Sequence, residues 1–126
     1  MNFPENLKYT NEHEWIRIEG NVGVVGITEY AQGELGDVVF VELPAVGKQF
    51  KRGDAFGTVE AVKAVSDLFA PISGEVLEVN PQLEKTPELV NKESYEGGWM
   101  LKLSIADSGE LGSLLSARQY REQIGK

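Results

Sequence analysis

The sequence predicts a mainly β fold with a few short helices, and three observations lead to this prediction. Short strand-like runs, alternating or wholly apolar, recur between glycine, proline and asparagine residues. Helical periodicity is confined to short segments and is clearest near the C-terminus. At 126 residues the chain has the size of a single domain and is long enough to bury a core without disulfides.

Three segments in the first half predict strands. Residues 15–19 alternate between apolar and polar side chains, residues 20–21 form a turn signal, and residues 22–27 return as a second strand. The pair predicts a β-hairpin. Residues 38–43 predict a buried strand, which Pro44 ends.

Two short helices are predicted before the C-terminal region. Thr28 predicts the N-cap of a helix over residues 29–32, which ends near Gly33 or Gly36. Further along, Asn80 followed by proline predicts another helical turn, with asparagine as the cap and proline at the first position.

The C-terminal region predicts one strand and one longer helix. Residues 99–105 alternate, so the odd-numbered side chains would face the core and the even-numbered ones solvent. Asp107 or Ser108 would then cap a helix over about 110–123, because leucines recur on one helical face.

Composition and charge argue against several functional classes. Twelve basic and twenty acidic residues give a formal charge of −8, which argues against nucleic-acid binding. The chain has no cysteine and one histidine, His13, so disulfides and thiolate metal sites are excluded and a histidine-based metal site is not expected. Residues 1–6 lack a signal or transit pattern, and no apolar run approaches the ~20 residues of a membrane span, so we expect a cytoplasmic, bacterial-type protein.

Common catalytic motifs are absent. There is no Gly-x-Ser-x-Gly motif, the glycines form no dinucleotide-binding pattern, and His13-Glu14 is not followed by a second histidine. Lys63 then stands out because it lies between two hydrophobic runs, where a turn would present its primary amine for acylation. Most lysines are only solvated, so this placement alone is a weak signal.

The residues around Lys63 resemble the lipoyl-lysine segment of the glycine cleavage system H proteins. Residues 59–67 and 70–76 carry the closest likeness, although the family pattern has serine where this chain has Ala61. The likeness runs nearly end to end, through Leu7-Lys8-Tyr9, His13-Glu14-Trp15, Val25-Gly26-Ile27-Thr28, residues 35–44, Gly98-Trp99-Met100 and residues 114–120. Several separate motifs in the right order make the resemblance highly specific.

The resemblance implies a biotinyl/lipoyl-carrier-like fold, a sandwich or flattened barrel of antiparallel strands with a few short helices and a C-terminal helix. One carrier domain would span residues 1–126, with the lipoyl hairpin at about 57–79. Lipoate would be bound covalently, through an amide, to Lys63. Glu60 and Gly74 would belong to the region that the lipoylating enzyme recognises, and we expect Gly74 to serve a turn that needs a positive φ.

The resemblance also implies a non-catalytic carrier in glycine catabolism and one-carbon metabolism. A lipoyl arm would accept an aminomethyl group from glycine at glycine decarboxylase (P protein) and present it to the aminomethyltransferase (T protein). Dihydrolipoyl dehydrogenase (L protein) would reoxidise the arm, and a lipoate ligase or octanoyltransferase would attach it. The reactive sulfurs would belong to lipoate, because the chain has no cysteine.

The transported aminomethyl group is cationic and prone to hydrolysis, so a carboxylate-lined cleft on the carrier could hold it through charge-assisted hydrogen bonds. Glu14 and Asp67 are the acidic residues that we expect there, with His13 as a neighbour. Ordinary surface positions are at least as good an explanation for both, because the chain has twenty acidic residues.

Four other functions fit parts of the pattern. A biotin carrier shares the fold but usually has Met-Lys-Met, where this chain has Val62-Lys63-Ala64. A lipoyl domain of an acyltransferase complex resembles Asp-Lys-Ala at the site and precedes Ala/Pro-rich linkers, neither of which occurs here. A binding module would leave Lys63 bare, and a lipoyl relay would use the H-protein fold to donate lipoate to other complexes. The sequence does not separate the relay from glycine cleavage.

Overall fold

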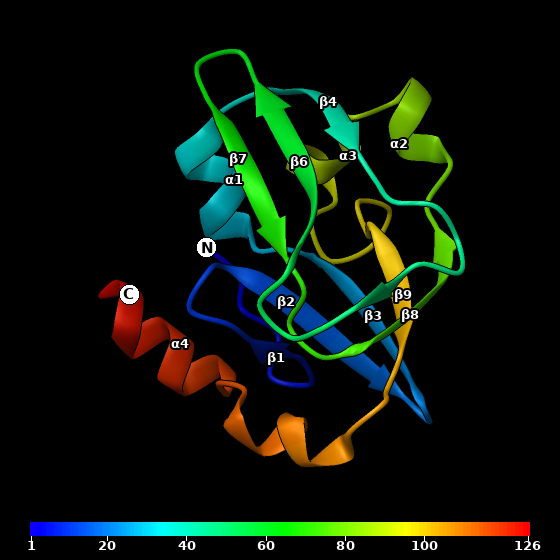
Figure 1. Cartoon of the computed structure of the whole chain (residues 1–126). Helices are drawn as coiled ribbons and strands as arrows, with labels where there is room; N and C mark the ends of the chain where they lie inside the picture. Colours follow the sequence, from blue (N-terminus) through cyan, green and yellow to red (C-terminus); the bar gives the residue numbers. More distant parts are fainter.

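Two antiparallel β-sheets share one core in the computed structural model, which describes residues 1–126 (Figure 1). The larger sheet has the strand order β1-β2-β3-β9-β8-β5, and the smaller has the order β4-β6-β7. The strands are β1 Lys8–Tyr9, β2 Glu14–Glu19, β3 Val22–Ile27, β4 Val38–Glu42, β5 Gln49–Phe50, β6 Ala55–Ala61, β7 Val65–Phe69, β8 Gly74–Val79 and β9 Leu101–Ser104. The predicted fold class is therefore confirmed.

Four short α-helices and one 3-10 helix complete the chain. They are α1 Glu29–Leu35, α2 Gln82–Lys85, α3 Leu89–Lys92, the 3-10 helix η1 Ser108–Ser113, and α4 Ala117–Ile124. The side-chain oxygen of Asn80 accepts the Gln82 N–H at 3.1 Å, so α2 begins close to the predicted position. None of these helices has both the length and the apolar character that a membrane span requires.

The first hairpin and the helix that follows it form where they were predicted. β2 and β3 pair along their whole length, and Gly20 makes the turn between them at a φ of 62°. Thr28 caps α1 by accepting the Ala31 N–H at 3.1 Å. Gly36 ends the helix with a φ of 85°, a left-handed value that glycine adopts without strain.

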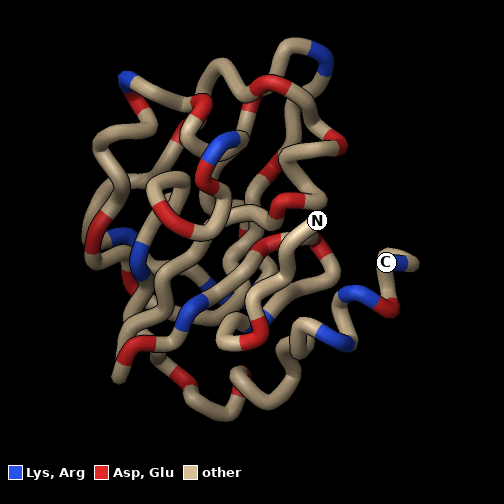
Figure 2. The backbone as a smooth tube through the Cα atoms, turned by 180° about the vertical axis from the view of Figure 1, so that it is seen from behind, with Lys and Arg blue, Asp and Glu red and all other residues tan.

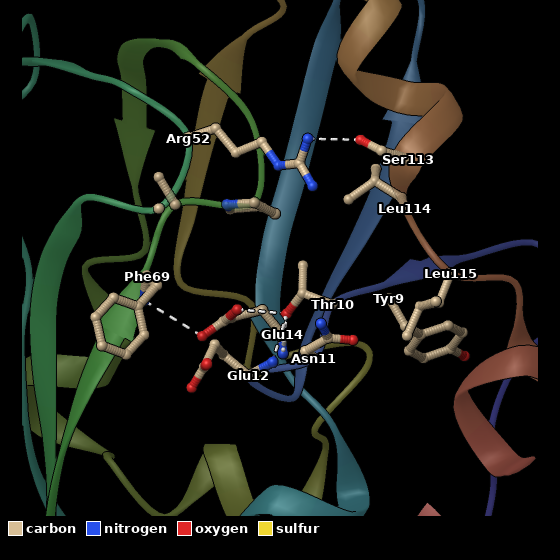
Figure 3. Close-up of a pocket in the computed structure, with 13 residues that line it drawn as sticks. Tyr9, Thr10, Asn11, Glu12, Glu14, Arg52, Phe69, Ser113, Leu114 and Leu115 are labelled. Carbon is tan, nitrogen blue, oxygen red and sulfur yellow. Dashed lines mark hydrogen bonds between the residues drawn. The ribbon is translucent and has the colours of Figure 1, made fainter. Parts of the chain in front are cut away.

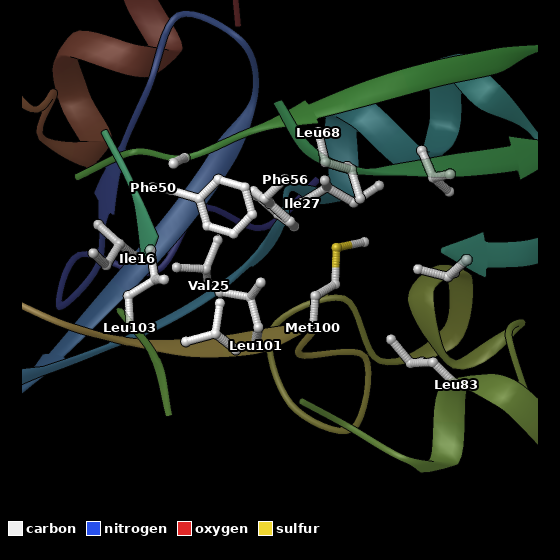
Figure 4. Packing of buried hydrophobic residues seen from close by; sticks show 14 of the residues in the cluster. Ile16, Val25, Ile27, Phe50, Phe56, Leu68, Leu83, Met100, Leu101 and Leu103 are labelled. Atoms are coloured by element: carbon white, nitrogen blue, oxygen red, sulfur yellow. The ribbon is translucent and has the colours of Figure 1, made fainter. Parts of the chain in front are cut away.

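The main hydrophobic core lies between the two sheets (Figure 4). Ile16, Val25 and Leu103 enter it from the larger sheet, and Phe56 and Leu68 enter it from the smaller one. Each is buried, and burial of a side chain of this size stabilises the fold by roughly 1.5–3 kcal/mol. The base of the β6–β7 hairpin is therefore held by the core, while its turn lies outside it.

An aromatic cluster holds α4 against the larger sheet. The rings of Tyr9 and Tyr120 stack with centroids 4.9 Å apart, and Phe3 meets Tyr120 edge-on at 5.6 Å. Trp15, from the same cluster, donates its indole N–H to the carbonyl oxygen of Ser94 at 2.9 Å. This packing brings the C-terminal helix next to the loop between β1 and β2.

The strand predicted over residues 38–43 is β4, but it is only half buried. Val38 and Val41 are buried, whereas Val39 and Phe40 are 50% and 52% exposed. The prediction of a buried strand was wrong because β4 is an edge strand that packs one face on the core.

The helix predicted over residues 110–123 is also wrong in its bounds, because the segment is divided into η1 and α4. Leu115 exchanges two backbone hydrogen bonds with Tyr9, each of 2.8 Å, so the chain is extended there. Ser116 then starts α4 through a capping box with Gln119. A strand-like bridge and a strong N-cap therefore replace the continuous helix that the leucine spacing favoured.

The hairpin predicted at about 57–79 is shorter in the structure. Only β6 and β7 pair with each other, and β8 lies in the larger sheet between β5 and β9. Gly74 begins β8 and does not have the positive φ that we expected. It is a glycine for another reason, because a Cβ at this position would lie 1.8 Å from the carbonyl oxygen of Ser104.

We therefore expect Gly74→Ala to destabilise the protein by about 1–3 kcal/mol or more, since a backbone carbonyl cannot move aside cheaply. Gly33→Ala is the matched control. Gly33 lies in α1, and a Cβ at this position would meet no atom within 4 Å. This substitution should stabilise the fold by about 0.5–1 kcal/mol through helix propensity. Urea unfolding measures both changes, and equal stabilities for the two variants would contradict the close approach at Gly74.

Candidate functional site

Lys63 lies in the turn that joins β6 to β7, and its side chain is exposed. The Ala61 N–H donates to the Ala64 carbonyl oxygen at 2.7 Å and closes the turn. The Val62 N–H donates to the Asp37 carbonyl oxygen at 3.0 Å and ties the turn to the loop between α1 and β4. The ammonium group is thus presented at the tip of an ordered hairpin.

The stem of the Lys63 side chain passes over Gly36. A Cβ at Gly36 would lie 3.2 Å from Lys63 Cε, which is closer than an ordinary van der Waals contact, and 3.8 Å from Cδ. The absence of a side chain at Gly36 therefore gives the lysine stem room beside the end of α1.

Exposed apolar side chains surround the lysine. Phe40, Glu60 and Val65 lie in one row across β4, β6 and β7, and Val65 is 65% exposed. Val62, next to the lysine, is 76% exposed. We call Val39, Phe40, Val62 and Val65 the tip surface. Few large apolar side chains of this protein are exposed, and these four are among them.

Below the tip lies a cavity of about 280 Å³, which we call the acidic cleft. It is lined by Glu12, His13, Glu14, Ile27, Tyr30, Ala31, Glu34, Leu35, Val59, Ser66, Asp67 and Leu68. The loop before β2, helix α1 and strand β7 supply most of these residues. The structure therefore brings together Glu14, Asp67 and His13, the three residues that the sequence singled out for a cleft.

Four carboxyl groups and no lysine or arginine line the acidic cleft. Besides Glu14 and Asp67 these are Glu12 and Glu34, which the sequence reasoning missed. Glu34 lies four residues after Tyr30 on α1, so both residues share one helix face. The sequence does not show that this face borders the cleft, because that depends on how α1 packs. A cavity lined by negative charges attracts cations. Acidic positions are also widespread elsewhere, whereas several basic ones lie along α4 near the C-terminus (Figure 2).

Glu14 is the buried carboxyl group of the site, with 2% of its surface exposed. Its Oε1 accepts the hydroxyl hydrogen of Thr10, and its Oε2 accepts the backbone N–H of Phe69 at 3.2 Å (Figure 3). Burial raises the pKa of Glu14 to about 7, although these two hydrogen bonds lower it. The group therefore changes its charge near neutral pH, and its ionisation responds to any cation in the cleft.

A second, smaller cavity of about 190 Å³ lies on another side of Glu14 (Figure 3). Thr10, Phe69 and Arg52 also line it, and the Arg52 guanidinium donates to the hydroxyl of Ser113 at 2.6 Å. Glu14 lines both cavities, so it forms part of the wall between them.

His13 has a φ of 72°, the only positive φ of a residue other than glycine. Its Nδ1 lies 2.8 Å from the hydroxyl oxygen of Tyr120, and its ring lies 5.2 Å from that of Tyr30. Burial lowers the pKa of His13 below its ordinary value, so the neutral form of the ring predominates at pH 7. Tyr120 contacts the site from α4, more than a hundred residues away in sequence, which is why no local pattern pointed to it.

The two residues expected to guide lipoylation lie in different places. Glu60 is exposed on β6, three residues before Lys63 and in the row that crosses the tip surface. Gly74 lies in the larger sheet, at the start of β8 (Figure 1). The chain reaches it only after β7 has run away from the Lys63 turn. The structure thus places Glu60 beside the lysine and assigns Gly74 a packing role, while recognition by an enzyme stays a prediction for both.

Known proteins resemble this chain over its whole length. A family model described as "Glycine cleavage H-protein" matches residues 7–126. The glycine cleavage system H protein of Bacteroides fragilis is 57% identical over 124 residues, 98% of each chain. That of Staphylococcus haemolyticus is 56% identical over 126 residues, all of both chains. The crystal structure of a glycine cleavage system H protein from Mycobacterium marinum matches with a TM-score of 0.90 at 40% identity, over 98% of this chain and 99% of that one.

The raised pKa of Glu14 leads to a prediction about stability and pH. The folded state binds the Glu14 proton more tightly than the unfolded state, where the ordinary pKa is 4.5. Stabilisation that is complete below pH 4.5 is therefore lost as the pH rises through about 7, by up to about 3 kcal/mol. Glu14→Gln should remove this decline, and urea unfolding at pH 5 and pH 8 measures it.

Glu60→Gln serves as the control, because Glu60 is exposed and should leave the wild-type pH profile unchanged. If Glu14→Gln and wild type lost stability in parallel between the two pH values, the buried carboxyl group would not be the cause.

Proposed function

We propose, because the chain belongs to the glycine cleavage H-protein family, that it carries an aminomethyl group on lipoate bound to Lys63. The carrier would receive this group at the P protein, deliver it to the T protein and be reoxidised by the L protein. The observation that supports this best is the placement of one exposed lysine at a hairpin tip directly above a cleft of carboxyl groups.

The residues at the tip fit a covalently attached acyl group. Lys63 Nζ is the atom that would form the amide, and Gly36 leaves space along the lysine stem. When bound, lipoate supplies a disulfide that opens to take the aminomethyl group and is closed again by oxidation. The protein itself has no cysteine, so it cannot trap the arm in a mixed disulfide with its own chain.

The acidic cleft would hold the cationic cargo and keep water from it. Asp67 lies four residues after Lys63 along the hairpin, which corresponds to roughly 13 Å of extended chain and is within reach of an acylated lysine. Asp67 and Glu14 would accept charge-assisted hydrogen bonds from the cargo. A cation close to Glu14 also lowers the pKa of that group, so Glu14 would release its proton as the cargo arrives.

The tip surface would be the common contact for the partner enzymes and for the enzyme that attaches lipoate. Val62 and Val65 flank the lysine and are mostly exposed, and Glu60 lies in the same row as Val65. An apolar surface with few charges suits short-lived docking by several enzymes. The ordered hairpin would place the arm, while the arm itself would reach each active site at high local concentration.

Lipoylation at Lys63 can be tested without an activity assay. After incubation with a lipoate ligase, lipoate and ATP, the wild-type protein should gain two titratable thiols per chain on reduction, since the chain has no cysteine. Lys63→Arg should gain none, and Lys85→Arg, which changes an exposed lysine of α2, should behave as wild type. Thiols that persist in Lys63→Arg, or their absence from the wild-type protein, would refute the attachment site.

The cleft can be tested through the lifetime of the loaded protein. Glu14→Gln and Asp67→Asn should each hasten spontaneous loss of the aminomethyl group by roughly threefold or more, because each removes a charge-assisted hydrogen bond. Formaldehyde release over time measures the loss. Glu75→Gln, an exposed acid on β8 outside the cleft, is the control and should match wild type. Equal lifetimes for all four proteins would remove the cleft from the proposal.

A further inference from the structure

Three side chains from distant parts of the sequence form a hydrogen-bonded chain beside the acidic cleft. The Thr28 hydroxyl lies 2.9 Å from the Tyr120 hydroxyl, and Tyr120 lies 2.8 Å from Nδ1 of His13. Thr28 is the N-cap of α1, Tyr120 belongs to α4, and His13 precedes β2. No part of the proposed carrier function uses this chain.

The direction of the hydrogen bonds follows from the burial of Thr28. Thr28 is 0% exposed, and its oxygen already accepts the Ala31 N–H at 3.1 Å. Its hydroxyl hydrogen needs an acceptor, and Tyr120 is the one available partner. Tyr120 therefore donates its own hydrogen to Nδ1 of His13. The opposite direction would leave the buried Thr28 hydrogen without an acceptor, which costs free energy.

This direction determines the tautomer of His13. When Nδ1 accepts a hydrogen bond, the proton of the neutral ring lies on Nε2. Nε2 makes no hydrogen bond within the protein, and no buried side-chain nitrogen or oxygen lacks a partner, so Nε2 reaches solvent. His13 lines the acidic cleft, and Nε2–H is the one donor of its neutral ring that the protein leaves free for a ligand.

The backbone holds His13 in this position at a cost. Its φ of 72° is unfavourable for a residue other than glycine, and such strain is concentrated at functional sites. Two backbone hydrogen bonds maintain it, one from the His13 N–H to the Thr10 carbonyl oxygen at 3.2 Å and one from the Thr28 N–H to the His13 carbonyl oxygen at 3.0 Å.

A donor is scarce in this cleft. The four carboxyl groups act as acceptors when ionised. The Ser66 hydroxyl already donates to the Asp67 carbonyl oxygen at 3.3 Å. The Tyr30 hydroxyl interacts with Glu34, whose charge and hydrogen bond raise the pKa of Tyr30. Acceptors suit a cationic amine but repel an electron-rich sulfur. A neutral histidine provides a donor without adding a positive charge next to the cargo, and burial keeps the pKa of His13 low.

We propose that Tyr120 is a positioning residue, which holds His13 as the Nε2–H tautomer so that this N–H donates to the free sulfur of the arm while carboxylates hold the amine. The proposal deepens the carrier function and rests on it for the identity of the sulfur. The tautomer itself does not depend on lipoate, so the two parts can be tested separately.

The tautomer is measured in unmodified protein by long-range ¹H–¹⁵N NMR of the imidazole ring, which is unambiguous because the chain has one histidine. The wild-type protein should show the proton on Nε2 alone, and Tyr120→Phe should show a mixture of both tautomers. Tyr9→Phe is the matched control: Tyr9 stacks on Tyr120, but its hydroxyl donates to the Pro4 carbonyl oxygen at 2.7 Å. It should leave the His13 signals unchanged. A wild-type ring protonated on Nδ1, or no change in Tyr120→Phe, would overturn the assignment.

The contact with sulfur is measured in lipoylated, reduced protein by the rate of thiol alkylation against pH. A donor stabilises the thiolate, so Tyr120→Phe should slow alkylation at pH 7 by roughly threefold or more, while Tyr9→Phe should not. His13→Asn should slow alkylation at least as much as Tyr120→Phe, since asparagine tolerates a positive φ but lacks Nε2 altogether, whereas Tyr120→Phe keeps a fraction of the Nε2–H tautomer. Equal rates in all variants would overturn the contact. A failure of the carrier function would instead be seen earlier, as Lys63 that accepts no lipoate.

Discussion

The site depends on the hydrogen bonds of one buried carboxyl group, that of Glu14. It begins β2 in the larger sheet, yet it accepts the backbone N–H of Phe69 at the end of β7 in the smaller one. The same group lines the acidic cleft and has a pKa raised to about 7 by burial. One side chain thus joins the lysine-bearing hairpin to the rest of the fold and places a charge that responds to cations beside it. Thr10 and Phe69 each donate a hydrogen bond to one oxygen of the group, which offsets part of the free-energy cost of burying its ionised form.

Rigid and exposed parts of the hairpin have different tasks in the proposed carrier. Val59 and Leu68 anchor the strands in the core, whereas Val62, Lys63 and Val65 lie at the exposed end. The cleft is built on the anchored part, with walls from α1 and the loop before β2. Tyr120 extends this support to α4, so the last helix of the chain helps to fix the geometry of a site whose lining lies within residues 12–68.

Sequence reasoning predicted the features that depend on local patterns. The β2–β3 hairpin, the Thr28 cap and the exposed Lys63 follow from alternation, capping chemistry and position between two apolar runs. It failed where distant contacts decide the structure. Leu115 pairs with Tyr9 and divides the predicted C-terminal helix. The sequence around Leu115 does not indicate this pairing, because Tyr9 lies near the other end of the chain.

The same limit applies to the site. The acidic character of Glu14 and Asp67 suits a cationic cargo, and the fold places both residues in one cavity. Glu34 and Tyr120 look like ordinary residues of amphipathic helices, because only the packing of α1 and α4 brings them to the cleft and to His13. The need for glycine at position 74 was similarly hidden, since it comes from a carbonyl group on another strand.

In the proposed carrier, the arm on Lys63 places its cargo in the acidic cleft. Backbone amide chemical shifts of lipoylated protein, compared before and after loading with the aminomethyl group, test this most directly. We predict that the signals of Glu14, Asp67 and Phe69 change on loading, the last because its N–H bonds to Glu14. Changes confined to residues 62–64 at the tip, with the signals of these three residues unchanged, would show that the cargo does not enter the cleft.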